Sequence, residues 1–392
     1  MPMRDDWHTG ARIREQRRLA HLTQRQLADQ LPYSYSLLNQ VECGAREASP
    51  ALITAVATVL RIDTSLLTEA KTMTHLQRRR LAALMHPIRA AFDLFDLDPD
   101  RAAETAPLSE LAATADAVCR QVRATRLRAA AEELPGLIVG LTHIVRTRPE
   151  TEAWRALASA YRTAHDIALK VGYPDLAAVA LDRMGWAAER ACDPCLAAVR
   201  QYKRALARQE SEELGHRLVR AGHALLAGET SREALAVAGQ LHLGAVAVSA
   251  RAGNHKAVAG HLEAARDLAA QVGGEAGDVH WLSFGRTNID LHALGAQVRM
   301  RQWGEGLAQA RAMRLPPSML MSRRARYLVD RAVVEMETGH TTASLRHLVE
   351  ARRLAPEQTR YLPGTRDAVS GLVHTMRRPP DGLTHLAAWI GL

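Results

Sequence analysis

The feature that most constrains this chain is the stretch of residues 23–44, which has the pattern of two short helices joined by a tight turn. Thr23 is a residue type that caps helix N-termini, and apolar residues recur at helical spacing over the predicted first helix, Gln24–Leu31. Pro32 interrupts the pattern, because its ring fixes φ and removes a backbone donor. Gly44 lies just past the second helix, where a residue that tolerates positive φ ends a helix well.

The second helix has two different faces. Ser34 caps it, and Leu37, Leu38 and Val41 recur at the spacing of a buried face. A helix lying in the major groove of DNA must donate and accept hydrogen bonds in order to distinguish base pairs. The outward face of this helix carries four side chains of that kind: Tyr35, Ser36, Asn39 and Gln40.

These residues carry a resemblance to a known family. The patterns T-Q-x-x-L-A at residues 23–28, S-x-S-x-L-x-x-V-E-x-G at residues 34–44 and A-S-P at residues 48–50 resemble the XRE class of helix-turn-helix regulators, whose head is similar to that of lambda repressor. The resemblance spans residues 8–68. It implies a five-helix head in which the fifth helix ends near Leu67.

The same resemblance implies roles for single residues of the head. The amide of Gln24 is expected to bridge a DNA phosphate and the recognition helix, while Arg25 is either a second phosphate contact or an ordinary solvated arginine. Arg17 is expected to pair with Glu42 and lock two helices together. Pro32 stands where the class usually has a glycine, so the turn must have another shape. The expected DNA-binding set is Gln24, Arg25, Ser34, Tyr35, Ser36, Asn39 and Gln40.

Composition favours an all-helical chain with more than one domain. Of the 392 residues, 47% are hydrophobic and only 4% aromatic, while Ala, Leu and Arg dominate and β-branched residues are sparse. This length is too great for one ordinary domain, but it suits a head followed by an array of repeats. The net charge of +9 fits a nucleic-acid partner, although arginine is spread along the whole chain and a plain compositional bias would give the same surplus.

Helical patterns continue after the head and recur as pairs. Trp154-x2-Leu157-Ala158-x2-Tyr161 has the spacing of the first helix of a tetratricopeptide repeat, and degenerate units follow at residues 241–268 and 328–356. Such pairs stack into a superhelix with a concave inner face. The breaks between helices fall at residues 97–100, 172–175, 192–195, 252–255, 273–278 and 315–317. We therefore expect an all-α fold with a head at residues 1–70, a linker at 71–78 and a tetratricopeptide-like α-solenoid at 79–392.

Two groups of residues are candidates for binding a ligand inside the superhelix. Asn288 and His292 lie one helical turn apart behind Phe284, and an asparagine amide can donate and accept at once. The alternative is that these side chains only hydrogen-bond to a neighbouring helix. Arg155 and Arg162 occupy positions that face inward in tetratricopeptide repeats, although both could be ordinary surface arginines.

The chain lacks the sequence signatures of metal sites and enzymes. Cys192-Asp193-Pro194-Cys195 is a CxxC, but no second pair or histidine stands at zinc-ligand spacing, and capping of the next helix by Asp193 explains the stretch. The motifs GxxxxGK[ST], HExxH, GxSxG and GxGxxG are missing, and the seventeen histidines are scattered. We therefore expect no metal, no cofactor and no enzymatic activity.

Function follows from the head and the repeats together. The chain has no 18-residue apolar run and no apolar signal core, so we expect a cytoplasmic protein with no membrane partner. We expect a homodimeric transcription regulator that binds operator DNA, and whose repeats bind a small-molecule or peptide signal that controls operator affinity. The alternative is a scaffold, in which the repeats bind a protein partner and the head only tethers it to DNA.

Overall fold

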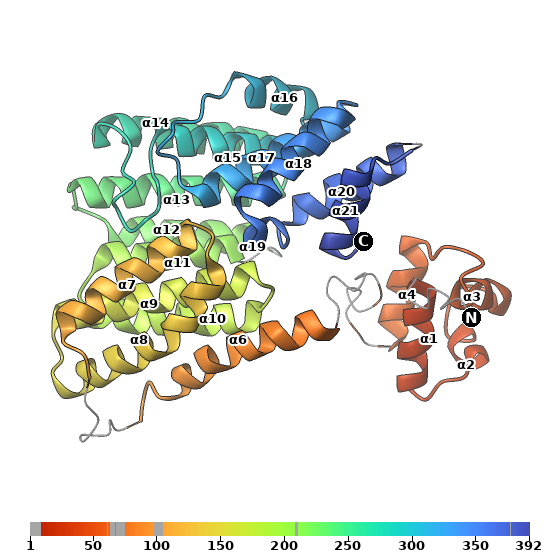
Figure 1. Cartoon of the computed structure of the whole chain (residues 1–392), viewed down its shortest axis with the longest axis horizontal. Coiled ribbons are helices and arrows are strands. Elements are labelled where there is room, and N and C mark those ends of the chain that lie inside the picture. Colours follow the sequence, from red (N-terminus) through yellow and green to blue (C-terminus); the bar gives the residue numbers. More distant parts are fainter. Residues whose placement is uncertain are drawn as a thin grey trace. The chain divides into compact units, whose positions relative to one another are not determined.

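The computed structural model describes residues 9–60, 62, 67, 75–97, 105–207, 211–376 and 378–392. Apart from turns and one isolated bridge between Ala276 and Phe284, the regular structure of these residues is helical (Figure 1). The all-α fold expected from composition is therefore confirmed. The chain divides into two compact units, one of Met1–Arg78 with Ile390–Leu392 and one of Arg79–Trp389.

The first unit is a small bundle around its own hydrophobic core. Its described helices are α1 (Thr9–Leu19), α2 (Gln24–Ala28), α3 (Tyr35–Glu42) and α4 (Pro50–Leu60). Each contributes apolar residues at helical spacing, and the core that they form includes Ile13, Leu27, Leu38, Val41, Leu52 and Val56. The predicted fifth helix falls mostly on residues outside the described ranges, although Leu67 is helical and buried.

Local sequence determines the ends of these helices. Thr23 caps α2 in a complete capping box with Gln26, and the hydroxyl of Ser34 accepts from the backbone N–H of Leu37 to cap α3. Helix α2 is shorter than the expected 24–31 and ends at Ala28, because Pro32 has no backbone N–H to donate to the carbonyl of Ala28. Gln30 and Leu31 donate instead to carbonyls three residues earlier. Helix α3 ends before Gly44, which has a φ of +80°.

The second unit contains the remaining described helices. Its first helix, α6, begins at His75, within the residues expected to be a linker, whereas residues 71–74 of that stretch lie outside the described part. Helix α6 spans His75–Asp93. The helices that follow it are α7 (Leu108–Arg123), α8 (Leu127–Thr147), α9 (Thr151–Lys170), α10 (Pro174–Arg190), α11 (Pro194–Ala207), α12 (Glu212–Leu225), α13 (Arg232–Arg251), α14 (His255–Val272), α15 (Arg286–Arg299), α16 (Trp303–Ala312), α17 (Met321–Glu337), α18 (Thr341–Leu354), α19 (Pro356–Thr359), α20 (Pro363–Thr375) and α21 (Asp381–Ile390).

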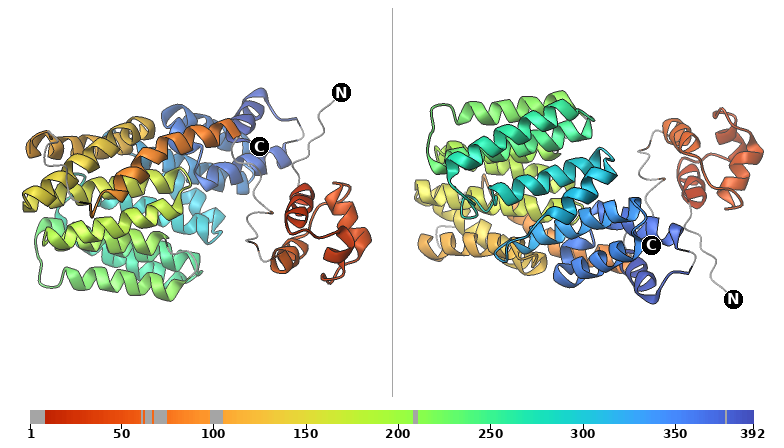
Figure 2. Two further views of the ribbon diagram at one scale, coloured as in Figure 1. Left: turned by 90° about the horizontal axis from the view of Figure 1, so that it is seen from below. Right: turned by 90° about the horizontal axis from the view of Figure 1, so that it is seen from above.

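Consecutive helices of this unit pack as pairs, which Figure 2 shows from two sides. The three predicted repeat units correspond to the pairs α9–α10, α13–α14 and α17–α18. Breaks expected from glycine, proline and aspartate lie between helices, as at residues 172–175 and 252–255. The break expected at 97–100 lies mostly outside the described residues.

Six helices of the second unit close into a cycle of neighbours, which we call the inner ring: α7, α9, α11, α13, α15 and α17. Each packs against the next, and the cycle is completed because α17 also contacts α7. Contacts between α19 and α8 support the same closure. Helices α7 and α17, which are about 200 residues apart in the sequence, are thereby brought side by side.

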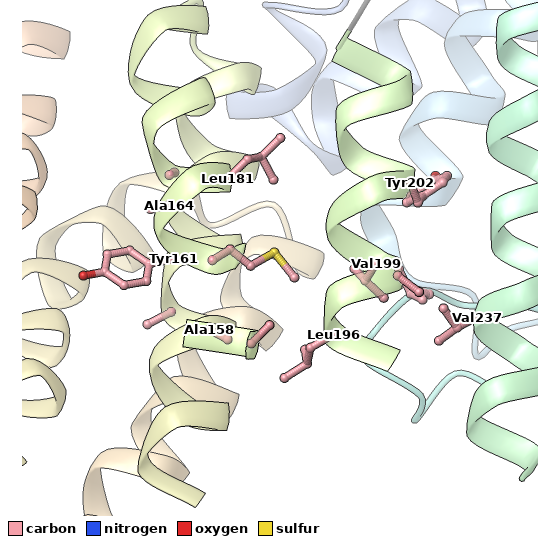
Figure 3. Close-up of a cluster of buried hydrophobic side chains, with 14 of the residues drawn as sticks. Ala158, Tyr161, Ala164, Leu181, Leu196, Val199, Tyr202 and Val237 are labelled. Atoms are coloured by element: carbon pink, nitrogen blue, oxygen red, sulfur yellow. The ribbon is translucent and has the colours of Figure 1, made fainter. Parts of the chain in front are cut away.

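One hydrophobic core runs along α7, α9, α11, α13 and part of α15, and a second joins α15 to α17. Figure 3 shows part of the first core, in which Tyr161 and Ala164 of α9 lie to the left, Leu196 and Tyr202 of α11 lie near the middle, and Val237 of α13 lies to the right of α11. Small residues such as alanine allow these helices to approach closely. Helix α13 is the one described helix long and apolar enough to cross a membrane, but 72% of its apolar window is buried in this core.

The loop at residues 273–285 crosses the inner ring and is held to several of its helices. The indole of Trp281 donates to Asp116 of α7 at 2.7 Å, and the guanidinium of Arg323 of α17 donates to the carbonyl of Leu282 at 3.2 Å. His280, Trp281 and Ser283 all have positive φ, between 44° and 59°. Non-glycine residues adopt such angles at a cost, so the surrounding contacts hold this loop in a strained conformation.

Candidate functional site

The recognition helix α3 presents a polar face to solvent. Leu38, Val41 and Glu42 are buried, whereas Tyr35, Ser36, Asn39 and Gln40 are exposed. Tyr35 and Ser36 lie one helical turn before Asn39 and Gln40, so one groove of DNA could contact the four side chains together. The hydroxyl of Ser34 is used for the helix cap and therefore positions the helix.

Gln24 at the start of α2 is tied to the recognition helix. Its amide nitrogen donates to Glu42 at 2.7 Å and lies 3.5 Å from the side-chain oxygen of Asn39. Its amide oxygen accepts from the hydroxyl of Tyr35 at 3.3 Å. The side chain therefore connects α2 to both ends of the exposed face of α3, while its neighbour Arg25 is exposed.

Arg17 and Glu42 form the ion pair expected from the sequence. Arg17 of α1 donates from Nε to Oε1 and from Nη2 to Oε2 of Glu42, both at 2.8 Å, and a third bond runs from Nη1 to the carbonyl of Leu22 at 2.7 Å. The hydrogen bond to the carboxylate, opposed by burial, raises the pKa of Arg17. Bidentate geometry of this kind fixes orientation as well as distance.

Of the predicted ligand residues in the second unit, Asn288 and His292 lie on the inner ring. Asn288 is 2% exposed and donates to the side-chain oxygen of Gln240 on α13 at 3.2 Å. The Oδ1 atom of Asn288 and the Nε2 atom of Gln240 are buried without hydrogen-bond partners among the described residues. The Nδ1 atom of His292 donates to the carbonyl of Asn288, 2.8 Å away, and burial together with the charge of Arg323 lowers the pKa of His292 to about 3.

The other three predicted ligand residues have different surroundings. Phe284 is fully buried, and its ring packs over Gly239, which leaves room for it. Arg155 is largely exposed and pairs with Asp193 at 2.9 Å, at the start of α11. Arg162 is 1% exposed, and donates to the carbonyl of His280 at 2.6 Å and to the sulfur of a cysteine on α7 at 3.3 Å. Of these three residues, only Arg162 is a charged side chain that is buried at the inner ring.

A set of charged residues that the sequence did not mark surrounds Asp166 of α9. Arg123 of α7 donates to this carboxylate at 2.8 Å, and Lys203 of α11 donates to its other oxygen. Burial disfavours the charged carboxylate, but the charges of Lys203 and Arg123 outweigh it and hold the pKa of Asp166 well below its usual value. Arg162, Asp166 and Lys170 recur every four residues on α9, a spacing that could have revealed this shared face.

The CxxC motif lies in a small cluster of metal-ligating residue types. Ligand atoms of Asp193, Cys195 and Glu233 lie within 4.8 Å of one another. Asp193 caps α11 through the N–H of Leu196 at 2.9 Å, as the sequence predicts, and also holds Arg155. Burial, followed by the charges of Glu233 and Asp193, raises the pKa of Cys195 to about 12, so its thiol is protonated at neutral pH.

Four of the scattered histidines gather between α12, α13 and α14. The Nδ1 atoms of His242 and His261 are 3.0 Å apart, and the ring of His223 lies 4.6 Å from that of His242. His216 stacks on His261 at 5.7 Å. Burial and neighbouring imidazoles lower the pKa of His242 to about 4, so this ring is neutral at pH 7.

Comparison with known proteins bears on the first unit. The family described as "Helix-turn-helix domain" matches residues 8–70. The search of curated proteins and the search of solved structures each returned no match. The matched residues contain α1 to α4 and the exposed face of α3. The protein is therefore a DNA-binding regulator whose head is a helix-turn-helix domain.

Proposed function

We propose that this protein is a cytoplasmic, homodimeric transcription regulator of the XRE class, and that its second unit is a tetratricopeptide-like sensor. The exposed face of α3 reads operator bases from the major groove, and Gln24 and Arg25 contact phosphates beside it. A small molecule or peptide bound within the inner ring changes the affinity of the head for the operator. The proposal assigns no catalytic activity, because none of the common enzyme motifs stands in the sequence.

One observation carries the sensor proposal. The Asn288–Gln240 pair is buried on the inner ring, yet one acceptor and one donor of the pair have no hydrogen-bond partner in the described part of the chain. Leaving a buried polar group unpaired costs about 1–3 kcal/mol. A ligand with a matching donor and acceptor would remove this cost, and the amides already lie next to each other.

Closure of the inner ring offers a way for ligand binding in the second unit to alter DNA binding by the head. The contact of α17 with α7 completes the ring, and a ligand that touches several ring helices binds the closed arrangement better than an opened one. In a dimer, a change in the ring would alter the spacing of two heads and hence their fit to a two-fold operator. The ligand shifts the equilibrium only by its difference in affinity for the two states.

The test begins with the DNA sequence that the full chain selects from a random pool. Operator affinity is then measured with and without cell extract, and the natively purified protein is analysed by mass spectrometry. A co-purifying small molecule or peptide whose addition changes operator affinity supports the sensor. A co-purifying protein, with operator affinity unchanged by any small-molecule fraction, would instead support a DNA-tethered scaffold.

A further inference from the structure

Five cationic side chains of the inner ring lie close together: four of them interact with the carboxylate of Asp166, and the fifth, Arg162, lies within electrostatic reach of Lys203. We define the cationic cluster as Arg123, Arg162, Lys170, Lys203 and Arg323, grouped around Asp166. They come from α7, α9, α11 and α17, so only closure of the ring assembles them. The neighbouring Arg326 is already neutralised by Asp330 at 2.7 Å. The cluster therefore keeps a surplus of positive charge after every pairing.

Burial and the neighbouring cations together lower the pKa of both lysines. Burial, with the charges of Arg123, Arg323 and Lys203, lowers the pKa of Lys170 to about 7 in spite of the opposing carboxylate. Burial and the charge of Arg123 likewise lower the pKa of Lys203 to about 8. Crowded like charges in a poorly solvated site are costly, and a fold that needed only stability would use apolar side chains there.

The cationic cluster also has hydrogen-bond donors that are not used within the described residues. The Nε atoms of Arg123 and Arg162 are buried without hydrogen-bond partners among the described residues. Lys170 donates to Gln358 at 2.6 Å, and an ammonium group has three donors. His292, which contacts the carbonyl of Asn288, lies within reach of the charge of Arg323. The cationic cluster is thus adjacent to the Asn288–Gln240 pair.

We propose that the cationic cluster binds a small organic anion through its phosphate or carboxylate group, with the guanidinium and ammonium donors of α7, α9, α11 and α17 around it. This inference rests on the proposed sensor function and names the class of its ligand. Arginine matches phosphate and carboxylate in a planar, bidentate geometry, and lysine adds a compact charge. The Asn288–Gln240 amides then contact the remainder of the molecule. Bound charge holds α17 against α7, α9 and α11.

The lysines provide a direct test, because the chain has only four of them: Lys71, Lys170, Lys203 and Lys256. The full-length protein is reductively methylated with ¹³C-formaldehyde, and each dimethyl-lysine signal is assigned by a Lys→Met variant and titrated by NMR. Inorganic phosphate and citrate are added separately, with sodium chloride keeping the ionic strength constant. The anion that binds should raise the pKa of Lys170 and Lys203 towards the usual value near 10.4 and leave exposed Lys256 unchanged.

Variants separate binding from structure. Lys203→Met and Lys170→Met should each weaken anion binding about tenfold or more. Lys170→Met should leave the thermal midpoint without anion equal or higher, because a crowded charge is removed, whereas Lys203→Met also removes one of the two partners of Asp166 and should lower that midpoint. Lys256→Met is the matched control and should bind as the wild type does. No pKa change in Lys170 or Lys203 with either anion, or an equal change in Lys256, would overturn the proposal.

The same experiment distinguishes the two proposals. If the lysine pKa values rise but the anion leaves operator affinity unchanged, the anion site is supported and the regulatory role of this ligand fails. If operator affinity responds to a fraction of cell extract while both lysines remain unaffected by phosphate, citrate and that fraction, the sensor survives and the anion site is wrong. A larger response to phosphate than to citrate, or the reverse, identifies the anionic group.

Discussion

Arg17 and Glu42 join the first helix of the head to its recognition helix by two parallel hydrogen bonds of 2.8 Å. Glu42 is 1% exposed and also accepts from Gln24 at 2.7 Å, so one carboxylate connects α1, α2 and α3. The orientation of the polar face of α3 therefore depends on a buried charge. Glu42, on the buried side of α3, thereby positions the exposed residues of the same helix.

Replacing Glu42 by Ala should destabilise the head by about 3 kcal/mol, because it leaves the buried guanidinium of Arg17 without its partner. Hydrogen exchange of residues 9–60 in the full chain measures this effect without requiring the head to be isolated. Glu47→Ala is the control, since Glu47 is exposed, and it should leave exchange unaltered. Equal protection in the Glu42 variant and the wild type would show that the pair does not stabilise the head.

Gln40→Ala should cost about 1–3 kcal/mol on the selected operator and relax the preference at one base pair, because Gln40 is exposed on the face that enters the groove. Binding to random DNA should stay the same. Arg25→Ala, by contrast, should weaken binding to operator and random DNA alike and reduce the salt dependence. If Gln40→Ala lowers both affinities equally, Gln40 does not read a base.

Asn288→Ala should preserve the fold and basal DNA binding but weaken or abolish the response to ligand. The substitution removes the donor to Gln240 and costs about 1–3 kcal/mol locally, which a unit of this size can tolerate. Operator binding is compared with and without ligand for the variant and for Arg286→Ala, an exposed change on the same helix. A normal ligand response in the Asn288 variant removes this residue from the site.

His292 should make the second unit sensitive to acid. Its pKa is about 3 in the fold and 6.5 when unperturbed, so between these values the unfolded chain binds the proton and the fold does not. Stability is therefore lost as pH falls below 6.5, by up to about 2 kcal/mol at pH 5. His292→Gln should lose less stability than wild type between pH 7 and pH 5, and the exposed His255→Gln should match wild type. Identical pH profiles for His292→Gln and wild type would contradict the assignment.

Gly239→Ala should destabilise the second unit by about 1–3 kcal/mol, because an added Cβ would lie 2.0 Å from the ring of Phe284. Gly260→Ala on α14 has no heavy atom within 4 Å of the added Cβ and should stabilise its helix by about 0.5–1 kcal/mol. Thermal unfolding of the two variants should therefore move in opposite directions. A Gly239 variant as stable as the wild type would show that Phe284 can move aside freely.

The sequence by itself determined the architecture of the head and the succession of helices. Caps such as Thr23 and Ser34 act on the next three residues, and Pro32 acts on Ala28, four residues before it, so short patterns contain the information. The exposed face of α3 follows from helical spacing alone. Asp193 capped α11 for the same local reason.

Tertiary structure alone decided the interior of the second unit. Arg123 and Arg323 are 200 positions apart in the chain, and no periodicity relates them; they meet around Asp166 because α17 packs against α7. The histidines at 216, 223, 242 and 261 likewise gather only when α12, α13 and α14 pack together. Local sequence fixes helix ends and faces through interactions within a few residues, whereas closure of the ring depends on packing between distant helices, and that closure assembles the charged site.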